Sequence, residues 1–364
     1  MKRLVVIAIA AGFALSSGAA RADNLPEKYR PAVQKGLEWI AKNQQRDGHW
    51  EANGAQYPTS MTALAGLALL MEGSTMREGK YADNIRRAVD WLVERSQRNG
   101  LIGNPNNFSE SSRYMYGHGF GMLFLASVYG EEEDGERRKK LEDVLTRAAD
   151  FCVKAQTNRG GWGYVSAADG QNFDEGSVTI TQLQGLRACR NAGIVVPKKG
   201  IDDAVEYLKK STTPKGGVIY SLAHGGAAMG GERPPLTAAA VSCAFNAGEY
   251  GSDLAKKWIK FCQTSIPIDK SGRDSFGHWE YTHFYYSQAI YILGEDGYAK
   301  MFPGSQPSEQ LRWSKYRETV FDYLTSRQSQ DGSWGQGHIG TIFTTACHMV
   351  ILQLDNGTLP IFQR

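Results

Sequence analysis

The chain has 364 residues, with 41 Lys and Arg against 38 Asp and Glu. Its basic excess lies within residues 1–22, where a basic start, an apolar run and Ala20-Arg21-Ala22 have the order of a secretory signal peptide. Cleavage after Ala22 leaves a neutral single domain, 23–364, which we expect to be periplasmic or secreted. Without a basic tract or a second long apolar run, binding to nucleic acid and a transmembrane segment are not expected.

The first unit of the mature chain predicts an amphipathic helix around Trp39, then Gln44, Gly48 and Trp50, then an apolar helix over 62–70. This skeleton recurs, with Gln five residues after an aromatic residue, Gly four residues further on and Trp two residues after the Gly. The aromatic positions are Trp39, Trp91, Phe151, Tyr207, Trp258 and Tyr323. The chain therefore contains six copies of one unit.

Three of the copies are modified. In units two and four, Ser96 and Thr212 replace the Gln, and Ile102 and Val218 replace the Trp. In unit five, an insertion of roughly Thr264 to Arg273 places the equivalent Trp279 ten residues late. The spacing of the aromatic positions is otherwise retained.

Each unit predicts an outer helix with a charged face and an inner helix of small and apolar residues. The predicted inner helices cover 62–70, 119–127, 181–189, 237–245, 287–293 and 345–352. Six hairpins whose end faces must be buried favour a closed ring. We therefore predict an all-α fold, an (α/α)6 toroid with an inner and an outer ring and a hollow at its axis.

The glycine and tryptophan of the skeleton have structural explanations. The glycine permits the left-handed residue that ends the outer helix, and the indole packs between hairpins. The glutamine can satisfy backbone groups near a helix end. For Trp50, Trp162 and Trp334, a stabilising role is expected in preference to a binding platform.

These six units resemble the repeats of squalene-hopene cyclases, oxidosqualene cyclases and protein prenyltransferase β-subunits, and the resemblance covers nearly all of the mature chain. It implies a toroid in which the N-termini of the inner helices surround a cavity that is apolar in the enzymes. It is specific for the fold and weak for the reaction.

The motifs of these enzymes are absent. No Asp-x-Asp-Asp string precedes an inner helix, which puts a standard cyclisation in doubt. Asp150-Phe151-Cys152 has the letters of the prenyltransferase zinc pair but lies on an outer helix, and His278 and His283 have no third ligand at matching spacing. We therefore expect no metal site and no cofactor.

The cysteines are expected to pack in the core. They are odd in number and contain no Cys-x-x-Cys pair: Cys152, Cys189, Cys243, Cys262 and Cys347. One pair could still form a disulfide in an oxidising compartment.

Adjacent acids before the third inner helix are the best catalytic candidates, because neighbouring carboxyls can have separated pKa values. They are Asp174 and Glu175, either of which could donate a proton; the competing interpretation is an acidic N-terminal cap of that helix. His118 occupies the place of a cyclase acid and could be their polar partner, or else a hydrogen-bonded core histidine.

Aromatic and polar residues near the starts of the inner helices are the candidate ligand-binding residues. They are Tyr116, His224, Arg233, His283, Tyr285 and Tyr286. They could line an apolar cavity and stabilise cationic character through their ring faces. For the segment around His283 the alternative is packing between inner helices.

The preferred hypothesis is an exported toroid that binds, and can transform, an apolar or isoprenoid-like ligand. The missing motifs keep open a non-catalytic binding or scaffold protein. Paired carboxyls on a secreted toroid keep open a glycan-active enzyme. The ligand's identity and the oligomeric state do not follow from the sequence.

Overall fold

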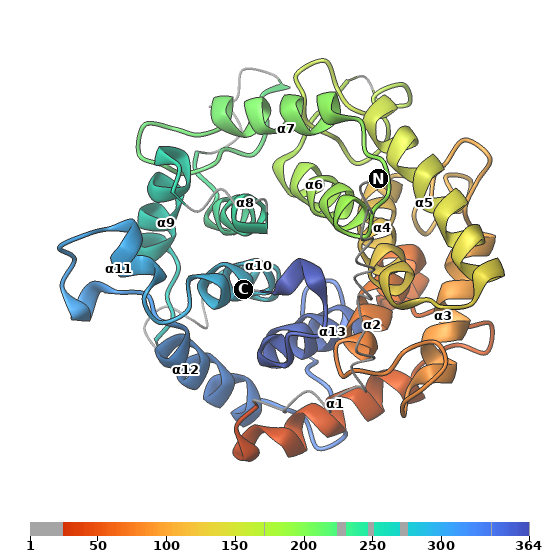
Figure 1. The fold of residues 1–364 in the computed structure, drawn as a ribbon, viewed down its shortest axis with the longest axis horizontal. Helices are drawn as coiled ribbons and strands as arrows, with labels where there is room; N and C mark the ends of the chain where they lie inside the picture. Colours follow the sequence, from red (N-terminus) through yellow and green to blue (C-terminus); the bar gives the residue numbers. More distant parts are fainter. Residues whose placement is uncertain are drawn as a thin grey trace, which may run out of the picture.

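The computed structural model describes residues 25–170, 172–223, 231–246, 251–269, 276–335 and 337–363. The predicted signal peptide, 1–22, and the candidate residue His224 lie outside this part of the chain. The described helices form two concentric rings (Figure 1).

The rings alternate along the chain, so each outer helix is followed by an inner one. The outer helices are α1 (Arg30–Lys42), α3 (Ala82–Glu94), α5 (Gly135–Lys154), α7 (Lys198–Lys210), α9 (Asp253–Ser265) and α12 (Trp313–Ser326). The inner helices are α2 (Pro58–Leu70), α4 (Tyr114–Glu131), α6 (Gly176–Asn191), α8 (Pro234–Asn246), α10 (Trp279–Leu293) and α13 (Thr341–Leu352). A short helix, α11 (Gly297–Met301), precedes α12. The predicted all-α toroid of six hairpins is confirmed.

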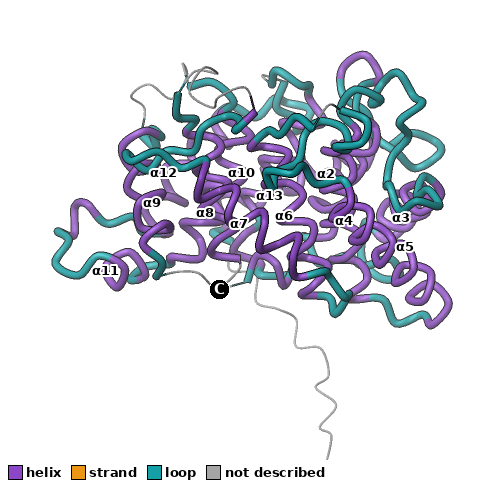
Figure 2. Tube along the Cα trace, turned by 90° about the horizontal axis from the view of Figure 1, so that it is seen from above, coloured by secondary structure: helices purple, strands orange, loops and turns teal. Residues whose placement is uncertain are grey.

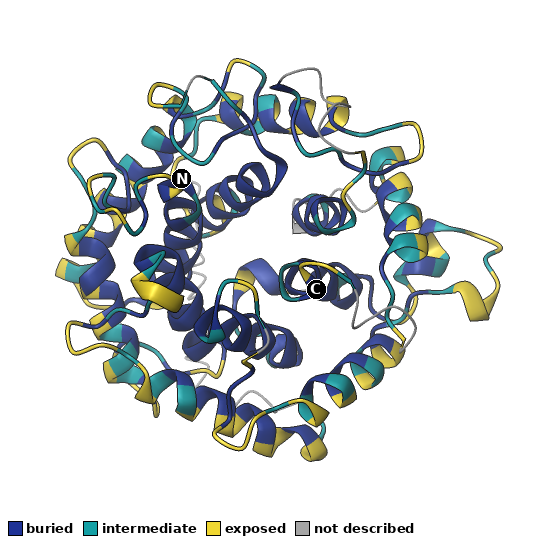
Figure 3. Ribbon diagram, turned by 180° about the vertical axis from the view of Figure 1, so that it is seen from behind, coloured by how far each residue is buried: buried dark blue, intermediate teal, exposed yellow. Residues whose placement is uncertain are grey.

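Burial separates the two rings. The inner helices are almost wholly buried, whereas the outer helices expose their charged faces (Figure 3). Every residue of α2 is buried. Small residues bring inner helices close together: a Cβ on Gly185 of α6 would lie 2.7 Å from the carbonyl oxygen of Gly119 on α4. The small-residue composition thus sets the spacing of the inner ring.

The repeat tryptophans join the two helices of their own hairpins. Their indole Nε1 atoms donate to carbonyls of the preceding outer helices: Trp50 to Ile40 at 2.8 Å, Trp162 to Cys152 at 2.7 Å and Trp334 to Leu324 at 2.8 Å. Their backbone N–H groups donate to threonine hydroxyls of the following inner helices: Thr62 at 3.0 Å, Thr179 at 3.0 Å and Thr345 at 3.1 Å. These contacts support the predicted stabilising role of the three tryptophans.

Trp279 does not take the equivalent position. It begins the inner helix α10 instead of preceding it, and its Nε1 has no hydrogen-bond partner in the described part of the chain. The insertion in unit five has therefore changed the role of its tryptophan as well as its place in the sequence.

The repeat glutamines join neighbouring units. The Nε2 of Gln44 donates to Gly48 in its own turn at 2.8 Å and to Asn84 at the start of the next outer helix at 2.9 Å. Gln156 makes the same pair of contacts with Gly160 and Gly200 at 2.7 and 2.9 Å. The sequence predicted that these side chains pair with backbone groups near a helix end. In the structure, each of them also connects two units.

The ring closes through the same contact. Gln328 of unit six donates to Gly332 at 2.9 Å and to Ala32 of α1 at 2.8 Å. On the inner ring, α13 packs against α2, and Gln353 donates to the carbonyl of Ala68 at 3.0 Å. The first and last hairpins therefore meet, as the sequence predicted.

Side chains cross the axis of the inner ring. The rings of Phe120 on α4 and Phe284 on α10 lie 6.3 Å apart edge to face, although these helices belong to units two and five. Gln184 on α6 donates to Gln288 on α10 at 2.9 Å. The prediction of a hollow running along the axis is therefore wrong at this level, because large side chains from opposite helices meet there.

Two further expectations concern individual side chains and helices. All five cysteines are buried and free, as expected from their apolar surroundings. No helix in the described residues is both long enough and apolar enough to cross a membrane.

Replacing Gln328 by Met should lower the free energy of unfolding by about 1–3 kcal/mol, because two part-buried carbonyls lose their donor at the closure of the ring. Urea denaturation measures the loss. Gln34→Met is the matched control, since Gln34 is exposed and its amide donates to the exposed Glu38. Equal stability of the two variants would contradict the closure role.

Candidate functional site

The candidate site lies at one end of the barrel, where the inner helices begin. Loops that connect outer to inner helices gather at this end (Figure 2). The inner helices begin earlier in the sequence than predicted: α4 begins at Tyr114 and α10 at Trp279. Residues expected in the entry turns therefore lie one or two turns inside the helices, which changes what they contact.

Glu175 is the N-cap of α6. Its carboxylate accepts hydrogen bonds from the backbone N–H groups of Ser177 at 3.0 Å and Val178 at 2.9 Å, and from the Ser177 hydroxyl at 2.5 Å. The side chain is 1% exposed and forms no ion pair with a described residue. Burial raises the pKa of Glu175, and the capping donors oppose this shift only in part. The structure thus confirms the cap and also holds the carboxyl in an environment that favours its neutral form.

Tyrosines surround this carboxyl. The hydroxyl of Tyr116 contacts Ser177 Oγ at 2.5 Å and Glu175 Oε2 at 3.4 Å. The Tyr116 ring lies 5.9 Å from that of Tyr164, whose hydroxyl hydrogen-bonds to the hydroxyl of Tyr220. All three rings are partly exposed, and burial raises the pKa of each hydroxyl. We call Glu175, Ser177, Tyr116, Tyr164, Tyr220 and Tyr281 the mouth cluster.

Tyr281 completes the mouth cluster from α10. Its ring lies 5.0 Å from that of Tyr285, and its buried hydroxyl has no hydrogen-bond partner among the described residues. Burial raises the pKa of Tyr281 well above its ordinary value. Tyr281 thus adds a neutral phenol hydroxyl to the mouth cluster.

Two arginines cover the outside of the mouth cluster. The guanidinium carbon of Arg113 lies 4.6 Å from the centre of the Tyr164 ring, and that of Arg233 lies 5.8 Å from the Tyr220 ring. Both arginines are exposed. Of the predicted ligand-binding residues, the structure therefore brings Tyr116 and Arg233 to this site.

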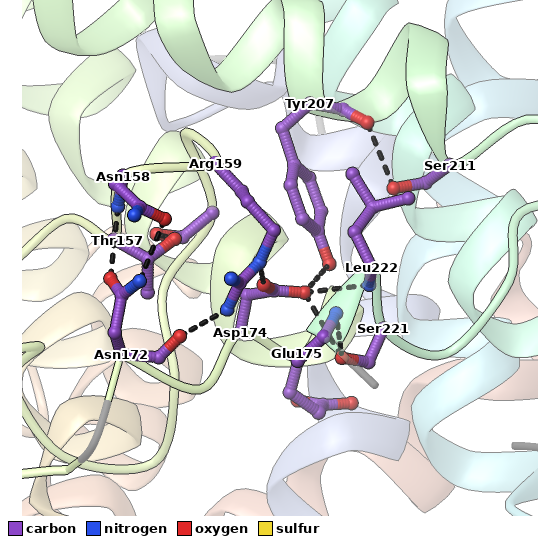
Figure 4. A network of polar contacts seen from close by, with 12 residues as sticks. Thr157, Asn158, Arg159, Asn172, Asp174, Glu175, Tyr207, Ser211, Ser221 and Leu222 are labelled. Atoms are coloured by element: carbon purple, nitrogen blue, oxygen red, sulfur yellow. Dashed lines mark hydrogen bonds and ion pairs between the residues drawn. The ribbon is translucent and has the colours of Figure 1, made fainter. Parts of the chain in front are cut away.

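Asp174 belongs to a different network (Figure 4). Its Oδ1 accepts from the Tyr207 hydroxyl at 3.0 Å, the Ser221 hydroxyl at 3.0 Å and the Leu222 N–H at 2.7 Å. Its Oδ2 pairs with Arg159. The carboxylate of Glu175 points away from this network. The contacts of Asp174 are those of a structural anchor between units three and four, and they do not support the predicted role as proton donor.

His118 is also occupied elsewhere. Its Nδ1 accepts from the N–H of Ile102 at 3.1 Å, and its Nε2 lies 3.2 Å from the carbonyl oxygen of Ala148. Ile102 and His118 thus repeat the Trp–Thr contact of the other units. Burial lowers the pKa of His118 to about 3, which keeps the ring neutral. The predicted partnership with the two acids is corrected, because neither ring nitrogen is free.

The remaining candidates on α10 lie beneath the surface. His283 is fully buried, stacks on Trp279 with ring centres 4.1 Å apart, and shares a 2.6 Å hydrogen bond with the Tyr316 hydroxyl. Tyr285 and Tyr286 have no exposed area. The prediction that they form cavity walls is corrected, because they pack within the inner ring. The Tyr285 ring also packs against that of Tyr281.

Two tyrosines of the mouth cluster do not stand out among the candidates that the sequence offers. Tyr164 and Tyr220 each stand two residues after the repeat position held by Trp162 and Val218. Their shared position in the repeat is the signal that could have identified them. Glu280 is a further carboxyl, on the first turn of α10, and burial raises its pKa. No group of three or more His, Cys, Asp and Glu side chains in the described residues is arranged to hold a metal ion.

Comparisons with known proteins agree on the fold. A probable squalene–hopene cyclase of Sinorhizobium fredii (strain NBRC 101917 / NGR234) is 24% identical over 208 residues, which are 52% of this chain and 31% of the relative. The chain thus spans less than a third of that protein's length. No family model matches the chain.

Solved structures of two chemical classes are similar. The type II terpene cyclase MstE from Scytonema has a TM-score of 0.57 at 13% identity, covering 91% of this chain and 99% of its own. The α-1,6-mannanase GH76A of Salegentibacter sp. HEL1_6 has a TM-score of 0.64 at 11% identity, covering 89% and 98%. The unsaturated glucuronyl hydrolase of Bacillus sp. GL1 has a TM-score of 0.61 at 16% identity, covering 92% and 99%.

The chain has the α/α toroid fold. At these identities the likeness shows the architecture alone, and it includes both terpene cyclases and glycoside hydrolases.

Asp174→Asn should lower the free energy of unfolding by about 3 kcal/mol, because Arg159 loses its buried counter-ion. Thermal and urea unfolding measure the effect. Glu175→Gln, which leaves no cation unpaired, should cost less. A smaller loss for Asp174→Asn than for Glu175→Gln would contradict the assignment of the two acids.

His348 gives a pH-dependent prediction. It is 5% exposed, neither ring nitrogen has a hydrogen-bond partner in the described residues, and burial lowers its pKa to about 3. Between this pKa and 6.5 the unfolded chain binds a proton that the folded chain does not, so stability falls as the pH falls. His348→Leu should gain about 1.4 kcal/mol per pH unit relative to the parent between pH 6 and 4. Urea unfolding as a function of pH measures this, and a constant difference would contradict it.

Proposed function

We propose that the protein is an exported toroid that binds an apolar, unsaturated small molecule at the mouth cluster, and that Glu175 donates a proton to it. The proposal depends chiefly on one observation: a fully buried carboxyl, which pairs with no cation among the described residues, lies among part-buried tyrosines. Burial raises its pKa. The likeness to a squalene–hopene cyclase and to terpene cyclase MstE supports the ligand class.

The chemistry would begin with Glu175 in its neutral form. Transfer of its proton to one carbon of an alkene breaks the π bond, forms a C–H bond and leaves a cation on the neighbouring carbon. The ring faces of Tyr116, Tyr164 and Tyr220 would stabilise this cation. A second alkene of the same molecule can attack it to form a C–C bond, and loss of a proton to the Glu175 carboxylate completes an isomerisation.

The hydrogen bonds around Glu175 serve the ionised state in this scheme. The N–H groups of Ser177 and Val178 and the hydroxyl of Ser177 would hold the carboxylate after proton transfer. Burial raises the pKa of the acid and so favours its protonated form beforehand. In this scheme, the site contains both the proton donor and the hydrogen-bond donors that stabilise the carboxylate left after proton transfer.

A glycosidase needs two carboxyls that face the same bond. The adjacent acids do not supply such a pair, because Asp174 is committed to Arg159 and points away from Glu175. This arrangement favours single-acid chemistry over the glycan-active alternative. A binding protein without turnover would use the same mouth cluster and is distinguished by experiment.

The direct test is incubation of the protein with squalene in deuterated water, followed by mass spectrometry of the products. An isomer that carries deuterium is expected, and Glu175→Gln should reduce its formation by at least about 100-fold. Glu280→Gln is the control, because it removes a carboxyl of raised pKa outside the mouth cluster. Undiminished formation in Glu175→Gln would contradict the catalytic role.

Binding is tested separately by mass spectrometry of molecules that co-purify with the protein from its native host. A polyprenoid retained by the parent and by Glu175→Gln, without deuterium incorporation in either, would indicate a binding protein. A soluble oligosaccharide in its place would contradict the proposal as a whole.

A further inference from the structure

Two arginines stand on either side of the acid of the mouth cluster. Arg113 directly precedes α4, Glu175 directly precedes α6 and Arg233 directly precedes α8. Helices α4 and α8 both pack against α6 on the inner ring (Figure 1). We propose that the ligand of the mouth cluster carries an oxyanion, a carboxylate or a phosphate, at one end of its apolar body, and that these two arginines bind this end. The inference rests on the proposed function, because it names the polar end of the same ligand.

Arg113 lies against the tyrosines of the mouth cluster. Its guanidinium carbon is 4.6 Å from the centre of the Tyr164 ring, and the Tyr164 hydroxyl hydrogen-bonds to that of Tyr220. Burial raises the pKa of both hydroxyls, and the positive charge of Arg113 opposes this shift in each of them. The charge of Arg113 therefore acts on both rings at once.

Arg233 lies against the second ring of this pair. Its guanidinium carbon is 5.8 Å from the centre of the Tyr220 ring. Because the hydroxyls of Tyr164 and Tyr220 are bonded to each other, the two arginines lie along one rim of the mouth cluster. Both arginines are exposed, so a ligand at the mouth can reach them.

Stacking on a ring suits a guanidinium for binding an oxyanion. A guanidinium that lies over a ring directs its N–H groups sideways, in its own plane. Two parallel N–H groups of this plane match the two oxygens of a carboxylate or a phosphate. The rings of Tyr164 and Tyr220 thus hold the arginines without using the groups that would bind the ligand.

The carboxylates that are nearest in sequence accept hydrogen bonds from other groups. Glu110 accepts from the backbone N–H of Asn104 at 2.7 Å, and Glu232 accepts from the Thr213 hydroxyl at 2.7 Å. Arg113 forms no ion pair with a described residue. Within the described part of the chain, its positive charge is therefore available to an anion.

The proposed reaction gives this anion a further effect. Transfer of a proton from Glu175 leaves a cation beside the tyrosine rings, and positive charges on the rim of the same site repel it. An oxyanion bound to the arginines reduces this repulsion. It also orients the ligand, because its charged end stays at the exposed rim and its apolar body extends toward the buried Glu175.

Isothermal titration at pH 7 tests the proposal with probes that share one unsaturated hydrocarbon body: geranate, geranyl phosphate, geraniol and geranylamine. At low ionic strength the better of the two anions should bind about 10-fold more tightly than geraniol, because charge-assisted hydrogen bonds add to the burial of the same body. Geranylamine should bind most weakly. Added salt should reduce the preference for the anion, since exposed charges are screened. Affinities for both anions no higher than that for geraniol, or no binding of either anion, would overturn the proposal.

Variants of the arginines locate the anion. Replacing both Arg113 and Arg233 by Gln should lower the affinity for the anions to that for geraniol and leave the affinity for geraniol unchanged. Arg113→Lys retains the charge without the planar group and should keep part of the preference.

Arg138→Gln is the matched control, because the Arg138 guanidinium carbon lies 4.3 Å from the ring centre of Tyr129, toward the other end of α4. A preference for the anion that survives in the double variant, or that Arg138→Gln removes equally, would refute the assignment.

Failure of this inference is distinguishable from failure of the proposed function. Glu175→Gln leaves both arginines in place and should retain the preference for the anion. Such a preference without deuterium incorporation into any probe would contradict proton transfer by Glu175 and would support the anion site. Deuterium incorporation into geraniol, with no preference for either anion, would support the acid and contradict the anion site.

Discussion

The structure depends on one repeated hydrogen-bond pattern between neighbouring units. A glutamine at the end of an outer helix donates both to its own turn and to the first turn of the next outer helix. In unit six the next outer helix is α1, so the same contact closes the ring. A chain held in this way has no free end face, and its inner helices can remain apolar on all sides without exposing that surface.

Closure brings the N-termini of all inner helices to one end of the barrel. There, the adjacent acids Asp174 and Glu175 have different partners. Glu175 has extended backbone angles, φ −150° and ψ 134°. Successive side chains of an extended segment point to opposite sides. Asp174 therefore reaches Arg159 and Tyr207, and Glu175 reaches the tyrosines of the mouth cluster. The local backbone, more than the identity of the acids, places one in the Arg159 network and the other in the mouth cluster.

The sequence was sufficient to predict the ring, because its repeat has a fixed spacing and the Gln and Trp of units one, three and six make equivalent contacts. It also indicated Glu175 as a helix cap, and the cap is observed. It failed for His118, because a histidine that substitutes for a repeat threonine cannot be recognised without knowing which backbone group it receives. The side chains that meet across the axis of the inner ring could not be predicted either. Phe120 and Phe284 are far apart along the chain and come into contact only because the ring closes.

The positions of Tyr164 and Tyr220 were accessible in principle, because both follow the repeat residue by two positions. The cavity lined by α1, the end of α2 and the segment after α13 could not be predicted, since its lining combines residues from the first and last units. Contacts within the repeat can be predicted because the spacing of the repeat residues fixes them. Contacts between distant units cannot, because they depend on how the ring closes.

The most direct measurement is the carboxyl ¹³C chemical shift of Glu175 as a function of pH in glutamate-labelled protein, with the signal assigned by its absence from Glu175→Gln. A titration midpoint clearly above that of an ordinary glutamate is expected, because the carboxyl is buried and pairs with no cation in the described part of the chain. A midpoint at or below the ordinary value would show a stabilised carboxylate and would contradict its assignment as a proton donor.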